Sequence, residues 1–261
     1  MRILTGYLAA TEGKAFVAGF DVFEHPNKVK KIIGYLPENL PLYGDMTVYS
    51  YLNFVAEIKQ IPGSKRKDAV EKAIEISGLE TVRARIIKNI SRGFKQRVGI
   101  AQTLIHEPQV LVLDEPTIGL DPAQIIEIRQ LIKSLKGDHT ILLSTHILAE
   151  VTQTCDGVVI INEGLLMASS SLEELTASFK EKDGIIVQVK KETKKAVSLL
   201  KEIPGVENVT EKDNEIKIEW SQKKDLRDDI TKLIVAKNLG LIEMRPLLMH
   251  IEDLYLKVIS G

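Results

Sequence analysis

The 261-residue chain has a formal net charge of −1 at pH 7, with 44% hydrophobic and 27% charged residues. This balance is typical of a globular protein with a buried core, and it gives no electrostatic reason to expect nucleic acid or an anionic membrane as the main partner. The longest apolar run, AFVAGF, has about six residues, against roughly 20 for a membrane-spanning helix, and a single cysteine excludes an internal disulfide. We therefore expect a cytoplasmic protein that reaches a membrane only through another subunit.

The first part of the chain reads as short elements followed by helices. Residues 1–10 carry apolar side chains at helical spacing and predict a helix, although no N-cap residue precedes it. Two short strands are predicted next, at 14–18 and 32–35. Three helices follow, at 47–60, at 64–77 with Ser64 as its cap, and at 96–106. Residues 46 to about 106 are therefore predicted to form a helical subdomain.

Apolar strands alternate with helices in the middle of the chain. The predicted strands are VLVLD (110–114), TILLS (140–144) and GVVIIN (157–162), and the helices between them are 124–135 and 148–154. This alternation is typical of a parallel sheet covered by helices on both faces, with ligands bound at the carboxyl ends of the strands. The fold class expected is therefore α/β.

The composition changes near residue 180, at KEKDG. Beyond it the predicted elements are strands at 185–190, 215–220 and 241–245, with helices at 196–202 and 226–236. We therefore divide the chain at this point, into a domain over residues 1–179 and a small α+β domain over residues 180–261.

Two acids stand at the end of the most apolar predicted strand. Asp114 and Glu115 follow VLVL, and adjacent carboxylates at a buried strand end need a partner. Mg²⁺ with a phosphate is a natural one, so Asp114 would hold the metal and Glu115 would act as general base on a water. The alternative is that both acids are simply solvated at the strand end. From these residues alone, the two interpretations receive about equal weight.

Three weaker signals accompany the acid pair. Ser91 and Gly93 precede a helix whose N-terminus offers N–H groups to an anion, although an ordinary capped helix explains them as well. Asp121 precedes Pro122 at a helix start, where an N-cap is at least as good an explanation. His146 lies just past a strand end, and a lone histidine there is more often simply polar than catalytic.

Together these motifs resemble the ATP-binding-cassette (ABC) ATPases. ISRGF (90–94) resembles the signature motif, VLVLDE (110–115) Walker B with the catalytic glutamate, GLD (119–121) the D-loop, and STH (144–146) the switch-histidine loop, while IIGYLPEN (32–39) stands where the Q-loop belongs. The resemblance covers residues 1 to about 179. Residues 180–261 resemble, more loosely, the C-terminal domain of bacterial exporter ATPases of the gliding-motility, drug and sodium-export type.

The resemblance implies a P-loop NTPase-like fold, ATP and Mg²⁺ as cofactors, and a role for each motif. Asp114 would coordinate Mg²⁺, Glu115 would activate water, and His146 would contact the γ-phosphate. Ser91 and Gly93 would bind the γ-phosphate of ATP held by a second ABC ATPase subunit, and Asp121 would communicate across that dimer. Residues 46 to about 89 would touch an integral membrane permease subunit, with the loop at 37–43 as the flexible link.

The chain departs from the family pattern at two places that matter here. Glu38 occupies the position of the Q-loop glutamine, where a carboxylate can still ligate Mg²⁺ or a water. The phosphate-binding loop G-x-x-x-x-G-K-[ST] does not occur, and MRILTG looks like the interior of the helix that follows that loop in the family. We therefore expect Met1 to be an internal methionine of a longer protein whose first strands and phosphate loop precede it, and the 261 residues alone to hydrolyse little ATP.

The function expected is that of an ATP-binding and ATP-hydrolysing subunit of an ABC exporter that drives transport through a separate membrane subunit. One alternative is a catalytically degenerate subunit that contributes only its signature half-site to an intact ATPase. A soluble ABC ATPase acting on ribosomes or DNA is a second, which the neutral charge and the exporter-like tail disfavour. The transported substrate cannot be read from this chain.

Overall fold

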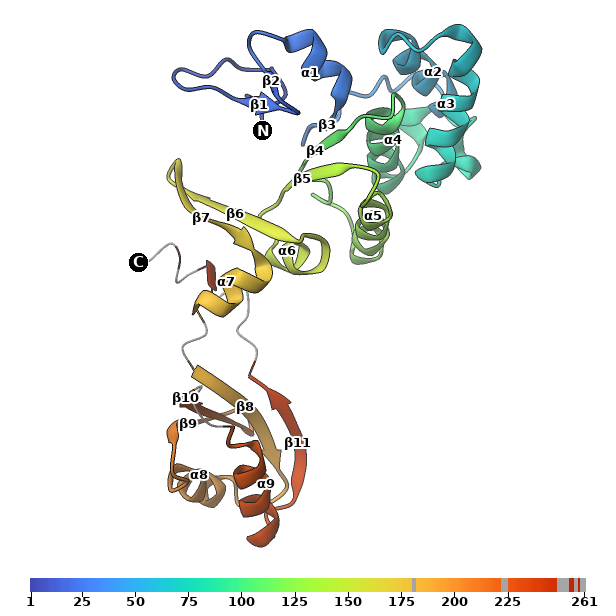
Figure 1. Cartoon of the computed structure of the whole chain (residues 1–261). Coiled ribbons are helices and arrows are strands. Elements are labelled where there is room, and N and C mark those ends of the chain that lie inside the picture. The colour runs from blue at the N-terminus through green and yellow to red at the C-terminus, as the bar shows by residue number, and fades with distance from the viewer. Residues whose placement is uncertain (180–181, 222–224, 248–253, 256–257, 259–261) are drawn as a thin grey trace. The chain divides into compact units, whose positions relative to one another are not determined.

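The computed structural model describes residues 1–179, 182–221, 225–247, 254–255 and 258 (Figure 1). The chain forms two compact units, Met1–Thr154 and Cys155–Gly261, which are described separately below. Within the described ranges, no helix combines the length and the apolar character that crossing a membrane requires. The division of the chain at residue 180 stays a prediction.

A three-stranded parallel sheet forms the centre of the first unit. Its order is β3-β4-β5, with β3 at Ile33–Leu36, β4 at Val110–Asp114 and β5 at Thr140–Ser144. The apolar strand residues pack with helices α4 (Arg92–Leu104) and α5 (Pro122–Ser134) in one core cluster. The predicted α/β fold class with a parallel sheet is therefore confirmed.

Helix α4 packs closely against strand β3. A Cβ on Gly34 of β3 would run into the carbonyl oxygen of Thr103, and a Cβ on Gly99 would lie 2.8 Å from the nearest Leu36 methyl carbon. Contacts of that length are not tolerated, so the two glycines permit this close approach.

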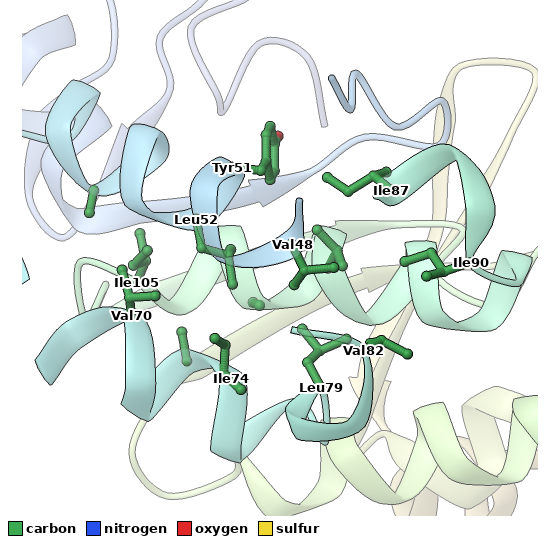
Figure 2. Packing of buried hydrophobic residues seen from close by; sticks show 14 residues of the cluster. Val48, Tyr51, Leu52, Val70, Ile74, Leu79, Val82, Ile87, Ile90 and Ile105 are labelled. Carbon is green, nitrogen blue, oxygen red and sulfur yellow. The ribbon is translucent and has the colours of Figure 1, made fainter. Parts of the chain in front are cut away.

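The predicted helical subdomain has its own core (Figure 2). Its helices are α2 (Val48–Ile58), α3 (Gly63–Ile76) and α4, joined by the 3₁₀ turns Glu80–Val82 and Ile87–Asn89. Leu52, Val70 and Leu79 have no exposed surface in this core. Two predicted helix starts are wrong: α3 begins at Gly63 after Pro62, so Ser64 is not its cap, and α4 begins at Arg92 rather than 96, because Ser91 caps it.

The N-terminal segment differs from the sequence prediction. Residues 2–6 form hydrogen-bonded turns rather than a helix, with the amide of Thr5 bonded to the carbonyl of Met1. Gly6 has a φ of +70°, which a right-handed helix does not allow, and so short a stretch forms too few helical hydrogen bonds to offset helix nucleation. Three short elements follow: β1 (Phe16–Val17), β2 (Phe20–Asp21) and α1 (Pro26–Ile32).

The strand at 157–162 does not belong to the parallel sheet. Helix α6 (Leu148–Thr154) ends the first unit, and in the second unit β6 (Gly157–Asn162) pairs antiparallel with β7 (Leu165–Ser171), which α7 (Leu172–Phe179) follows. Glu163 and Gly164 between the two strands have φ values of +49° and +80°. Two consecutive left-handed residues form the tight turn that a two-residue hairpin needs, so the pairing is local.

The second unit also contains a four-stranded antiparallel sheet of order β11-β8-β10-β9. Its strands are β8 (Lys182–Val189), β9 (Val206–Lys212), β10 (Glu215–Ser221) and β11 (Leu241–Pro246), and its helices are α8 (Thr193–Lys201) and α9 (Arg227–Ala236). Alternate residues of β10, such as Ile216 and Ile218, are buried against the helices. The strands and helices predicted here are present, and β9 is an additional strand.

Candidate functional site

The acid pair lies where the parallel sheet ends. Register places Asp114 opposite Ser144, the last residues of β4 and β5, and the Ser144 hydroxyl donates a hydrogen bond to Oδ1 of Asp114. The Asp114 side chain is thus oriented by the neighbouring strand. The sequence motifs contain both residues, but only the pairing of β4 with β5 shows that they are partners.

Glu115 has an unusual backbone. Its φ is +48°, in the left-handed region that costs a residue with a side chain about 1 kcal/mol or more. Its amide donates to the carbonyl oxygen of Ser144 at 3.1 Å, which holds it against the end of β5. The turn directs the side chain toward the loop after β5.

Glu115 and His146 form a pair. Nδ1 of His146 lies 2.8 Å from Oε2 of Glu115, and the imidazole is 67% exposed while the carboxylate is 18% exposed. The hydrogen bond to Glu115, together with the negative charge of that carboxylate, raises the pKa of His146. Glu115 therefore stabilises the protonated form of His146 relative to an isolated imidazole.

Glu38 and Asp114 line the same cavity, of about 570 Å³, in the first unit. Tyr35, Lys59 and Gln102 line it as well. Burial raises the pKa of the Tyr35 phenol, and the negative charge of Asp114 raises it further. Tyr35 is a site residue that the sequence analysis missed, although its position in the strand before the Glu38 segment could have suggested it.

The signature and D-loop residues form a second group. Ser91 caps α4 by accepting a hydrogen bond from the Phe94 amide at 3.3 Å, and Asp121 caps α5 by accepting one from the Gln124 amide at 3.0 Å. Both side chains therefore have the capping role that was the plain alternative for each. A Cβ on Gly93 would lie 2.7 Å from Cδ of Gln124, so the two helix starts are packed together.

The donor set around Asp114 suits Mg²⁺ bound together with a phosphate ligand. Within the described ranges, no three His, Cys, Asp or Glu side chains gather closely enough to hold a metal ion by themselves. Mg²⁺ is commonly held by one or two carboxylates plus phosphate oxygens and water. The Asp114 carboxylate and the Ser144 hydroxyl, joined by a hydrogen bond at the strand ends, fit that mode of binding.

Known proteins resemble this chain over most of its length. A family model described as ABC transporter matches residues 1–118. The bacitracin transport ATP-binding protein BcrA of Bacillus licheniformis is 30% identical over 263 residues, covering 100% of this chain and 84% of BcrA. The probable multidrug ABC transporter ATP-binding protein YbhF of Escherichia coli is 29% identical over 262 residues, covering 100% of this chain. The chain spans about half the length of several relatives, 44% in the case of YbhF.

Solved structures agree with the sequence relatives. An ATP binding subunit of an ABC transporter is 27% identical and superposes with a TM-score of 0.60, covering 68% of this chain and 75% of that one. CbiO1 from Clostridium perfringens, part of the ABC transporter complex cbiONQ, is 28% identical with a TM-score of 0.61, covering 67% of this chain and 72% of its own. With the motifs at the ends of β4 and β5, these relationships show that the chain belongs to the ABC transporter ATP-binding protein family.

Proposed function

We propose that the chain is the ATP-hydrolysing subunit of an ABC exporter, acting at the cytoplasmic face of the membrane on a separate permease subunit. The names of YbhF, a probable multidrug transporter protein, and BcrA, a bacitracin transport protein, support an exporter. The observation that carries the proposal is the Glu115–His146 pair, directly after Asp114.

The geometry suits a general base with an adjacent phosphate contact. The Glu115 carboxylate takes the proton of the attacking water. His146 orients that carboxylate through Nδ1 and presents the rest of its exposed ring to the terminal phosphate. Asp114 and Glu38 would hold Mg²⁺, which neutralises charge on the phosphates of ATP when bound. Oriented by Ser144, the Asp114 carboxylate needs little reorganisation to bind the ion.

The proposed unit is a dimer with a second ABC ATPase subunit, identical or different. Ser91 and Gly93 would bind the γ-phosphate of ATP held on that subunit. Asp121 would communicate between the two subunits of the dimer. The close packing of Gly93 on Gln124 supports this, because it sets the signature residues and the D-loop helix in one rigid group.

A degenerate subunit that donates only this signature half-site is the second candidate. Its support is that residues 90–94 and 119–121 are both present and packed together.

The test is Mg²⁺-dependent ATP hydrolysis by the protein purified from its own cells, and by its Glu115→Gln variant. Loss of a general base should lower turnover by about 100-fold or more. Glu127→Gln, which removes an exposed carboxylate paired with Arg97, is the matched control and should hydrolyse ATP normally.

The outcomes separate the candidates. Hydrolysis that Glu115→Gln leaves unchanged contradicts the proposal. A chain that is inactive alone, but forms a complex with a second ATPase whose turnover falls with Ser91→Arg, supports the half-site donor. Co-purification with a membrane protein supports transport, whereas co-purification with ribosomes supports the non-transport alternative.

A further inference from the structure

A buried carboxylate lies behind the Glu115–His146 pair. Glu150, in the first turn of α6, is 1% exposed. An ionised carboxylate taken out of water is costly unless it is paired and hydrogen-bonded. The hydrogen-bond partners of the Glu150 carboxylate therefore indicate its structural role.

The first partner lies in the loop after β4. The Thr117 hydroxyl donates to Oε1 of Glu150, and Thr117 is itself buried. The loop is tight, because the amide of Ile118 donates to the carbonyl oxygen of Glu115 at 3.2 Å, and the amide of Leu120 donates to that of Thr117 at 3.2 Å. Fixing Thr117 thus fixes the turn that begins at Glu115.

The second partner lies in the loop after β5. The Thr145 hydroxyl donates to Oε2 of Glu150 at 2.8 Å and accepts a hydrogen bond from the amide of Ile147 at 3.0 Å. These bonds hold the residues on both sides of His146. The two oxygens of one carboxylate thus bind the two loops that carry the proposed base and the switch histidine.

Arg129 of α5 is the third partner of the Glu150 carboxylate. Nη2 of Arg129 lies 3.4 Å from Oε1 of Glu150, and Nη1 of Arg129 donates to Oε1 of Gln153 at 2.9 Å. The Arg129 side chain is only 14% exposed. The buried negative charge is therefore compensated, and α5 is tied to the same point.

We propose that Glu150 is a positioning residue that clamps the loops of Glu115 and His146 together so that the pair forms. This inference rests on the proposed function for its catalytic consequence, but the clamp itself is a property of the fold. Glu150 touches neither Glu115 nor His146 through a hydrogen bond of its own, and it acts through Thr117 and Thr145.

Glu150→Gln weakens the clamp with little change in volume. The amide has one acceptor oxygen, so its NH₂ group must face either Thr117 and Arg129 or the Thr145 hydroxyl. The threonine that faces the NH₂ group must reverse its role from donor to acceptor, and the other threonine keeps only a hydrogen bond to a neutral oxygen in place of one to a carboxylate. Both loops are therefore held more weakly, and Arg129 loses its opposite charge.

The primary test is hydrogen–deuterium exchange of the whole chain followed by mass spectrometry. In Glu150→Gln, we expect exchange to rise by about tenfold or more in the peptides covering residues 115–121 and 144–149, and to stay unchanged in α2 and α3. An unchanged pattern, or a rise throughout the chain, would overturn the clamp.

The threonines test the clamp if Glu150→Gln does not fold. Because one carboxylate joins both loops, Thr117→Val should raise exchange in 144–149 as well as in its own loop, and Thr145→Val should do the converse. Effects confined to the mutated loop overturn the proposal. Thr152→Val removes an exposed hydroxyl from the same helix and should change neither peptide.

Steady-state kinetics separate the clamp from the proposed function. If the chain hydrolyses ATP, Glu150→Gln should lower kcat at least tenfold while KM for ATP stays within twofold, because Glu150 does not contact the nucleotide. A change in KM without a change in kcat would count against a positioning role. If the parent chain hydrolyses no ATP, the proposed activity fails while the exchange experiment still decides the clamp.

Discussion

The guanidinium group of Arg92 lies directly against the backbone of Gly119. A Cβ on Gly119 would lie 2.7 Å from Nη1 of Arg92, closer than any real contact of that kind. Arg92 stands between Ser91 and Gly93 of the signature, and Gly119 begins the D-loop. The two motifs are therefore in contact within one chain.

Gly119→Ala should be destabilising mainly through its backbone. The φ of +67° is unfavourable for alanine, whereas the new Cβ meets only the end of the exposed Arg92 side chain, which can move aside. We therefore expect a loss of about 1–2 kcal/mol in the free energy of unfolding, measured with urea. Gly137→Ala, at a φ of +93° with open space around it, should lose about as much. A loss in Gly119→Ala that disappears when Arg92→Ala is added would contradict the backbone account.

Gly93→Ala should be destabilising through Gln124. The methyl group would lie 2.7 Å from Cδ of Gln124, so overpacking should cost about 1–3 kcal/mol, seen as a lower thermal unfolding temperature. In Gln124→Ala the same substitution should be nearly neutral. Equal losses in both backgrounds would show that the packing contact is unimportant.

The strained backbone of Glu115 predicts a difference in stability between two variants that lack its carboxylate. Glycine adopts a φ of +48° without strain, whereas glutamine does not. Both lose the carboxylate, and we expect Glu115→Gly to be about 1 kcal/mol more stable than Glu115→Gln in urea unfolding. A less stable glycine variant would argue against strain at this position.

His106 predicts a loss of stability at mildly acidic pH. Burial, and then the positive charge of Lys59, lower the pKa of His106 to about 4, from an ordinary value of 6.5. Between these values the unfolded chain holds a proton that the folded chain does not, so the free energy of unfolding falls as the pH falls. His106→Gln should show a smaller decrease between pH 7 and pH 5 in urea unfolding. An equal decrease in parent and variant would contradict this assignment.

The sequence predicted the parts of the site that are local. Asp114 and Glu115 directly follow an apolar strand, and Ser91 and Asp121 directly precede helices, so neighbouring residues are enough to place them. Each of these signals spans only a few residues.

The parts of the site that the sequence did not predict depend on which segments of the chain pack together. Glu150 has the sequence context of an ordinary helical surface acid, and its burial follows only from the packing of α6 against α5 and the two loops. The partnership of Ser144 with Asp114 requires the order of the strands in the sheet. The predicted helix at residues 1–10 failed because apolar spacing does not reveal the left-handed φ of Gly6.

The glycine contacts between α4 and β3 have a mechanical consequence. Gly34 lies against the Thr103 carbonyl, and Gly99 lies against the side chains of Leu36 and Leu40, so helix and strand are tightly packed. A 13-residue helix is about 20 Å long, with Ser91 just before its first residue and Thr103 near its last. We expect a displacement of Ser91 to be transmitted along α4 to β3, and so to the segment after β3 that carries Glu38.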